Sequence, residues 1–305
     1  MTTVLMFPGQ GAQEVGMGAD LYREYPAAKA VFDRADEVLG YKISELCFNG
    51  PAERLNATDV QQPAIFVTSV AALEAAKGLG RWELAPAYAG GLSLGEYTAY
   101  HAAGALGFDS ALKLLAARAR FMQEAAEATD GGMVAVIGLD DEKVEAICRE
   151  AGQGEVLVVA NYNCPGQVAL SGQKAAIDRA ARAAEAAGAM KVVILDVAGA
   201  FHSPLMQSAA DKLKPILEET AFSKPKFPVV ANVDCQFHDD PDAIRRSLYT
   251  QVTSATWWAK SMQKLLELGA DEFVEVGPKK TLTAFMKRIS RRTKTANIST
   301  SADLK

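Results

Sequence analysis

Residues 87–100 read AYAGGLSLGEYTAY, and this stretch decides the predicted fold. An apolar run over 85–89 predicts a buried strand, the pentapeptide Gly91-Leu92-Ser93-Leu94-Gly95 forms a tight turn, and a helical pattern begins at Glu96. A strained turn between a strand and a helix lifts a serine hydroxyl above the edge of a sheet. Glycines are needed on both sides because a side chain would clash where strand and helix crowd together. The pattern predicts Ser93 as a nucleophile, although a GxSxG match alone also arises by chance.

Outside this turn the sequence alternates between short apolar runs and longer helical patterns. Strands are predicted over 3–7, 228–233 and 272–276, and helices over 21–39, 64–77 and 109–128. Asp109 opens the last of these helices and is predicted to cap it with its own carboxylate. Strands that alternate with helices favour a parallel sheet covered by helices on both faces.

The stretch 129–197 shows a different pattern. Strands are predicted over 133–138, 156–161, 167–171 and 190–197, and helices over 141–151 and 173–187. The order β-α-β-β-α-β is the ferredoxin-like pattern. We therefore expect an α/β-hydrolase-like parallel-sheet core built from residues 1–128 and 198–305, with 129–197 as an inserted ferredoxin-like small subdomain.

The composition excludes several classes of function. The net charge of −5 lacks the basic footprint that nucleic-acid binding needs. No window approaches the ~20 apolar residues of a membrane span, and the N-terminal apolar run lacks the basic segment of a signal peptide. The four cysteines form no CxxC pair and no zinc-ligand spacing. We expect a cytoplasmic protein with reduced thiols and without a metal, a membrane partner or a nucleic-acid partner, and nothing demands more than a monomer.

A serine nucleophile needs a base, and the chain has three histidines. His101 follows Ser93 on the same predicted helix at roughly 12 Å along the axis, too far to touch the hydroxyl. His238 lies in the acidic sequence FHDDPD, which is typical of a solvated turn. His202 follows the end of a predicted strand, where ligands meet α/β sheets. Elimination favours His202 as the base.

Acyl transfer also needs hydrogen-bond donors for an oxyanion. The N–H of Leu94 is one candidate because it directly follows the nucleophile at a helix N-terminus. The loop after the first strand offers a second, since Gly9 and Gly11 would let the backbone of Gln10 approach a ligand closely. The same glycines fit an ordinary tight turn equally well.

Six motifs occur in an order that resembles one family. They are FPGQGAQ at 7–13, GLSLGEY at 91–97, RARFMQ at 118–123, NYNCPGQ at 161–167, GAFHSP at 199–204 and EVGP at 275–278. The sequence resembles the malonyl-CoA:acyl carrier protein transacylases and the related acyltransferase domains of fatty-acid and polyketide synthases, over nearly the whole chain. The resemblance implies ping-pong transfer of malonyl from coenzyme A to the phosphopantetheine thiol of holo-acyl carrier protein in fatty-acid biosynthesis, without a permanently bound cofactor.

The resemblance also implies roles for single residues. Ser93 would carry the malonyl group, and His202 would act as base, held by backbone carbonyls near Gln251 and not by a carboxylate. The N–H groups of Gln10 and Leu94 would form the oxyanion hole.

Three residues are implied to recognise the acyl group. Arg118 would bind the malonyl carboxylate, for which its planar guanidinium is suited; its sequence position alone indicates a helix-surface residue. Asn163 would line the same pocket, and the aromatic Phe201 would leave less room for the branch of methylmalonyl.

The chain departs from the family pattern at two positions. Leu92 stands where the family usually has histidine, and we expect little effect on the hydroxyl chemistry. Lys279 follows EVGP where the family often has glycine, which would alter the pantetheine entrance. The basic run 279–294 fits either a solvated helix face or a contact with an acidic carrier protein.

Other functions remain open on the residues. A discrete acyltransferase of a polyketide synthase would share every motif. A serine hydrolase or thioesterase would share the turn around Ser93, but Arg118 and the lack of a triad acid disfavour it. A silent carrier-binding module has no need for Ser93, His202 and Arg118 together.

Overall fold

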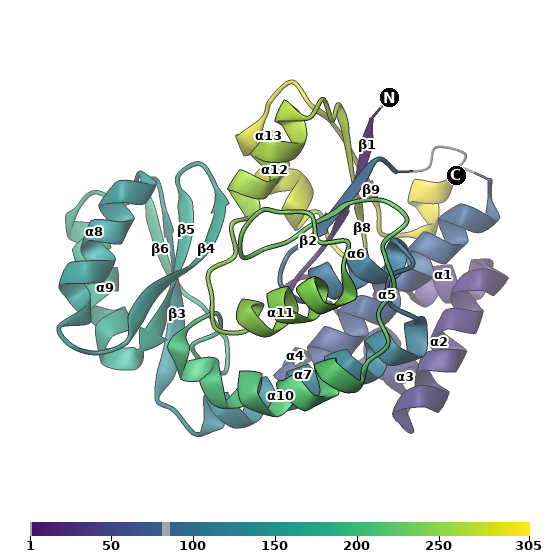
Figure 1. Cartoon of the computed structure of the whole chain (residues 1–305), viewed down its shortest axis with the longest axis horizontal. Coiled ribbons are helices and arrows are strands. Elements are labelled where there is room, and N and C mark those ends of the chain that lie inside the picture. The colour runs from purple at the N-terminus through teal and green to yellow at the C-terminus, as the bar shows by residue number, and fades with distance from the viewer. Residues whose placement is uncertain (1, 81–85) are drawn as a thin grey trace.

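The computed structural model describes residues 2–80 and 86–305, and it contains two separate sheets (Figure 1). The larger sheet has the strand order β7-β2-β1-β8-β9, and all its neighbouring strands are parallel. Its strands are β1 (Thr3–Phe7), β2 (Tyr88–Gly91), β7 (Val229–Val230), β8 (Glu272–Val276) and β9 (Lys294–Ile298). This is the parallel sheet that the alternating sequence predicts.

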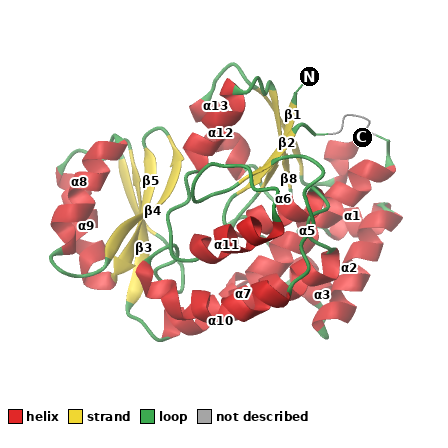
Figure 2. Ribbon diagram, in the orientation of Figure 1, coloured by secondary structure: helices red, strands yellow, loops and turns green. Residues whose placement is uncertain are grey.

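Helices pack on both faces of this sheet (Figure 2). The large part of the molecule contains the helices α1 (Ala19–Glu24), α2 (Pro26–Leu39), α3 (Ile43–Asn49), α4 (Ala52–Asn56), α5 (Thr58–Gly78), α6 (Leu94–Ala102), α7 (Phe108–Glu127), α10 (Gln207–Glu219), α11 (Pro241–Gln251), α12 (Trp258–Glu267) and α13 (Thr281–Ile289). Strand β1 shows the two faces, because Leu5 and Phe7 belong to the core that includes α5, whereas Val4 and Met6 pack with α12 and α13. Successive side chains of a strand point to opposite faces.

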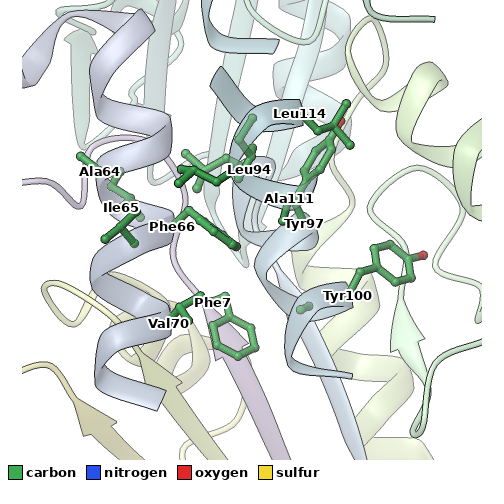
Figure 3. Packing of buried hydrophobic residues seen from close by; sticks show 14 of the residues in the cluster. Phe7, Ala64, Ile65, Phe66, Val70, Leu94, Tyr97, Tyr100, Ala111 and Leu114 are labelled. Atoms are coloured by element: carbon green, nitrogen blue, oxygen red, sulfur yellow. The ribbon is translucent and has the colours of Figure 1, made fainter. Parts of the chain in front are cut away.

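The core around α5 and α6 is apolar and closely packed (Figure 3). Phe66 of α5 and Leu94 and Tyr97 of α6 lie in it, and all three are essentially inaccessible to solvent. Phe7 at the end of β1 belongs to the same cluster. Because α6 starts directly after the turn around Ser93, this packing fixes the position of the turn.

The smaller sheet has the order β4-β5-β3-β6 and is antiparallel throughout. It consists of β3 (Gly131–Ile137), β4 (Leu157–Cys164), β5 (Gln167–Gln173) and β6 (Lys191–Ile194), with α8 (Asp141–Gly152) and α9 (Lys174–Ala186) packed against it. The element order and the strand order confirm the ferredoxin-like fold. The two sheets share no strand, which supports our division at residues 129 and 197; the division stays a prediction.

Contacts between the two parts involve the loop before α12. Thr256 exchanges backbone hydrogen bonds with Ala160 and Tyr162 of β4, at 2.8 and 3.0 Å. The rings of Tyr162 and Trp257 stack with centroids 4.1 Å apart. Arg288 of α13 donates to the side chain of Gln167 at 3.0 Å. These bonds hold the small sheet against the large part of the molecule.

Several sequence predictions of single elements were wrong. The helix predicted over 21–39 is interrupted at Tyr25, which is extended because a residue before proline disfavours the helical region. Asp109 does not cap α7: Gly107 occupies the N-cap position, and Asp109 accepts hydrogen bonds from Arg34 instead. Strand β9 was missed because Lys294, Thr295 and Asn297 give this edge strand no apolar run.

Other boundaries shift by a few residues. The strand predicted over 228–233 is limited to Val229–Val230, because the chain then turns and Cys235 N–H bonds back to the carbonyl of Ala231. The strand predicted over 190–197 ends at Ile194. Residue 85, at the start of the strand predicted over 85–89, lies outside the described residues. In the part of the chain that the structure describes, no helix combines the length and the apolar character needed to span a membrane.

Candidate active site

The turn between β2 and α6 has a conformation that only its glycines allow. Ser93 has φ 54° and ψ −108°, outside the usual regions for a residue with a side chain. A Cβ atom on Gly91 would lie 1.9 Å from the carbonyl oxygen of Gly95, and one on Gly95 would lie 2.2 Å from that of Phe7. The two glycines therefore let α6 start directly against the ends of β1 and β2.

Asn232, two residues beyond β7, supports this turn from the side. Its Oδ1 accepts the N–H of Ser93 at 2.7 Å, and its Nδ2 donates to the carbonyl of Gly91 at 2.7 Å. Asn232 is buried. Sequence reasoning missed this residue and placed it inside the strand predicted over 228–233. Because β7 already ends at Val230, Asn232 lies at the edge of the sheet where the carboxyl ends of parallel strands gather.

Ser93 and His202 form a hydrogen-bonded pair. The distance from His202 Nε2 to Ser93 Oγ is 2.8 Å, and His202 Nδ1 lies 2.8 Å from the carbonyl oxygen of Gln251. A carbonyl can only accept, so Nδ1 carries the proton and Nε2 accepts the serine hydroxyl. The structure thus places a backbone carbonyl where a triad has its carboxylate.

The surroundings keep His202 neutral. Burial, and then the positive charge of Arg118, lower the pKa of His202 to about 4, and the backbone carbonyls of Gln251 and Ser254 oppose this shift only in part. A neutral imidazole with a free Nε2 lone pair can take the proton of Ser93.

Arg118 lies behind Ser93 and is 1% exposed. Its Nη2 donates to Ser93 Oγ and to Gln251 Oε1, both at 3.0 Å, and its Nη1 donates to Gln62 Oε1. The helix-surface position that the sequence alone indicated was wrong. Burial lowers the pKa of the guanidinium, but arginine stays charged in proteins.

Within residues 2–80 and 86–305, Arg118 forms no salt bridge with a carboxylate, although the nearby Glu96 interacts with its charge without touching it. Among the described residues, its polar contacts are the amide oxygens of Gln62 and Gln251 and the hydroxyl of Ser93. Its Nε is buried and has no hydrogen-bond acceptor in that part of the chain. A buried unpaired cation is costly, so this arrangement suits an anionic ligand group that enters beside Ser93.

A cavity of about 200 Å³ opens in front of the serine, between the two sheets. Its lining includes Gln10, Leu92, Ser93, Asn161, Asn163, Gln167, Phe201, His202 and Phe285. Five of the eight residues predicted for the site line it, and Arg118 and Gln251 lie directly behind Ser93. The eighth, Leu94, is the first residue of α6, where N–H groups have no carbonyl partner within the helix.

The two departures from the family pattern also have definite positions. Leu92 lines the cavity, so this leucine contributes apolar surface beside Ser93. Lys279 has φ 62°, a conformation that glycine adopts without strain. Its Nζ donates to the carbonyl of Gly11 at 2.9 Å and so links the loop after β8 to the loop after β1.

The other histidines take no part in this arrangement. His101 Nδ1 lies 2.9 Å from the carbonyl of Leu106, and its ring packs against Phe66. His238 Nε2 lies 3.0 Å from Asp234. The structure also adds Glu96 and Gln62, which the sequence analysis did not select; both are buried beneath the site. No cluster of potential metal ligands occurs among the described residues.

These features fit a serine acyltransferase, and the comparisons show that class of enzyme. The family model described as "Acyl transferase domain" matches residues 4–302, so the chain belongs to the acyl transferase domain family and is an acyltransferase.

Its relatives narrow the class. The malonyl CoA-acyl carrier protein transacylase of Escherichia coli (strain K12) is 43% identical over 93% of this chain and 91% of its own length. The enzyme of the same name from Bacillus subtilis (strain 168) is 40% identical over 96% of this chain and 92% of its own length.

Solved structures give the same result. The malonyl CoA-acyl carrier protein transacylase of Coxiella burnetii superimposes with a TM-score of 0.97 at 36% identity, covering 100% of this chain and 96% of that one. A malonyl-transacylase in complex with its type II PKS acyl-carrier protein superimposes with a TM-score of 0.95 at 38% identity, covering 100% of this chain and 98% of that one.

Proposed function

We propose that this protein transfers malonyl from malonyl-CoA to the phosphopantetheine thiol of acyl carrier protein, through a malonyl-serine intermediate on Ser93. The observation that carries the proposal is the buried, unpaired guanidinium of Arg118, with Nη2 3.0 Å from Ser93 Oγ. An acyl group that ends in a carboxylate would supply the missing negative charge. A simple acyl chain would leave the cation unpaired.

In the first half-reaction His202 Nε2 takes the proton of Ser93 Oγ, and the oxygen attacks the thioester carbonyl. The negative charge that develops on the carbonyl oxygen would be stabilised by the N–H groups of Gln10 and Leu94. Collapse of this intermediate breaks the carbon–sulfur bond. The imidazolium returns the proton to the sulfur, and coenzyme A leaves as the free thiol.

The second half-reaction runs the same steps in reverse order. The pantetheine thiol gives its proton to His202 and attacks the malonyl-serine ester, and Ser93 Oγ leaves with that proton. A dyad suffices because a thioester is already an activated acyl donor. The carbonyl of Gln251 fixes the imidazole orientation that both steps require.

The remaining site residues would select the acyl group. Arg118 would bind the malonyl carboxylate with its planar fork. Asn163 and Phe201 line the cavity in front of Ser93. Phe201 would disfavour methylmalonyl, although one methyl group contributes only ~1–3 kcal/mol of discrimination.

The pathway assigned by this proposal is fatty-acid biosynthesis in the cytoplasm, by a monomer without a resident cofactor, metal, membrane partner or nucleic-acid partner. One observation favours a second assignment. The solved malonyl-transacylase that superimposes at a TM-score of 0.95 is bound to a type II PKS acyl-carrier protein. A discrete acyltransferase of a polyketide synthase would use the same site.

Intact-mass measurement after brief incubation with malonyl-CoA tests the proposal. We expect one malonyl adduct on the wild type and none on Ser93→Ala. Free malonate without an adduct would instead indicate a hydrolase, and an unmodified protein without turnover would indicate a silent carrier-binding module. Transfer rates to carrier proteins from the two pathways would separate the two assignments.

A further inference from the structure

Glu96, in the first turn of α6, carries a carboxyl group that is fully buried beneath the site. Its Oε2 accepts two hydrogen bonds, from Gln251 Nε2 at 2.7 Å and from the backbone N–H of Asn232 at 3.2 Å. Neither donor belongs to α6. The backbone N–H of Glu96 donates to the carbonyl of Ser93 at 3.1 Å, whereas the hydrogen bonds of its carboxyl group go to Gln251 and Asn232 and not to the Ser93 or His202 side chain. A substitution of this side chain would therefore act on the chemistry through these two partners.

The amide of Gln251 connects this carboxyl group to Arg118. Besides Glu96, Gln251 Nε2 donates to the carbonyl of Ser93 at 3.0 Å, and Gln251 Oε1 accepts from Arg118 Nη2 at 3.0 Å. Three of the hydrogen-bonding positions of one buried side chain are therefore occupied, one by the guanidinium donor of Arg118 and two by oxygen acceptors, the Ser93 carbonyl and the ionised carboxylate of Glu96.

The polarity of these partners permits only one orientation of the amide. If the amide of Gln251 were flipped, its oxygen would face two acceptors, Glu96 Oε2 and the carbonyl of Ser93. Its NH₂ group would face the guanidinium of Arg118, which offers donors only. Gln251 is inaccessible to solvent, so water cannot take over the lost bonds.

We propose that Glu96 is a positioning residue that sets the amide orientation of Gln251, so that the amide oxygen holds the guanidinium of Arg118 beside Ser93. This inference rests on the proposed function, because it concerns how the site prefers an acyl group with a carboxylate. A weaker hold on Arg118 would reduce the reaction of malonyl-CoA more than that of acetyl-CoA, which has no carboxylate.

A purely structural role for Glu96 predicts something different. The bond to Asn232 could simply brace the loop after β7. Its loss would then lower the fraction of folded protein or disturb the turn around Ser93. Both effects would slow malonyl-CoA and acetyl-CoA alike, and their rate ratio would not change.

The test measures the second-order rate constants of adduct formation with malonyl-CoA and acetyl-CoA by intact mass. For Glu96→Ala we expect the malonyl-to-acetyl ratio to fall about tenfold, as for the loss of one hydrogen bond to a charged group. Glu96→Gln retains an acceptor oxygen and should keep the ratio within about twofold of wild type. Thr98→Val is the matched control, because Thr98 is buried on the same helix and its hydroxyl makes no hydrogen bond within the described residues.

The ratio does not depend on how much of a variant is folded. If Glu96→Ala yields no folded protein, Glu96→Asp carries the same test, since it withdraws the carboxyl group from Gln251 by one methylene. A wild-type ratio in the Ala or Asp variant overturns the inference, and so does an equal fall in Thr98→Val. Absence of a malonyl adduct on the wild type would instead overturn the proposed function.

Discussion

Replacing Arg118 with alanine is the most direct perturbation of this site. The substitution removes a guanidinium that is 1% exposed and donates to Ser93 Oγ, Gln251 and Gln62. The amide oxygens of the two glutamines would then face an empty space. The Ser93–His202 hydrogen bond does not pass through Arg118, so this pair of side chains remains.

The magnitude follows from the burial of the lost charge. Breaking one side of a buried ion pair costs about 3–5 kcal/mol. At about 1.4 kcal/mol for each factor of ten, kcat/KM for malonyl-CoA should fall by about 10²–10⁴. Acetyl-CoA brings no carboxylate to the site, so its kcat/KM should change by less than about tenfold, and the preference for malonyl should disappear.

Rates of adduct formation with both thioesters, followed by intact mass in a quenched-flow apparatus, measure this change. Arg118→Lys keeps a charge but loses the planar fork, and should fall between wild type and Arg118→Ala. Arg120→Ala is the matched control, because Arg120 lies on the same helix with 64% of its side chain exposed. An equal loss for malonyl-CoA and acetyl-CoA would refute the role assigned to Arg118.

Four further results are expected. Because the pKa of His202 is lowered to about 4, serine acylation should persist below pH 6.5; a half-maximal rate at pH 6.5 in quenched-flow measurements would contradict this. Burial, the largest cause, raises the pKa of Glu96 to about 7, so its contribution to stability is complete below about pH 4.5 and lost as pH rises through 7. In urea unfolding, the free energy of unfolding of Glu96→Gln should therefore rise by up to about 3 kcal/mol relative to that of wild type between pH 5 and 9. A difference between the two proteins that does not change with pH would contradict this expectation. Gly95→Ala should destabilise the fold by about 3 kcal/mol or more in thermal melts; Gly132→Ala, whose added Cβ meets nothing within 4 Å, should not, and equal melting temperatures would argue against the steric reason. If the basic run 279–294 meets an acidic carrier protein, added salt should slow transfer to that protein more than transfer to free pantetheine; equal salt responses would exclude the contact.

Much of the fold was predictable because its signals are local. Strand β1 is an apolar run buried on both faces, and the insert alternates its elements in a recognisable order. The wrong predictions concern elements whose structure is determined by contacts with distant parts of the chain. Strand β9 is an edge strand with polar residues. The side chain of Asp109 accepts a hydrogen bond from Arg34 of α2 and does not cap the N-terminus of its own helix, α7.

The site was predictable only in part from the residues. The turn around Ser93 and the elimination of two histidines selected two residues that the structure brings within hydrogen-bond distance, since both arguments depend on short stretches of sequence. The burial of Arg118 was not visible from its helix and required the family resemblance. Glu96 and Asn232 escaped notice because each acts through a partner more than 100 positions away in the chain.

The side chains of strand β3 have two roles, one in lining the cavity and one in packing the small subdomain. Met133 and Ala135 line the cavity in front of Ser93, whereas Val134 and Val136 pack with the residues of α8 and α9. Neighbouring positions of one strand thus face different surroundings. Substitutions at Met133 and Ala135 can therefore widen or narrow the cavity, while Val134 and Val136 keep the subdomain packed and Ser93 and His202 stay unchanged.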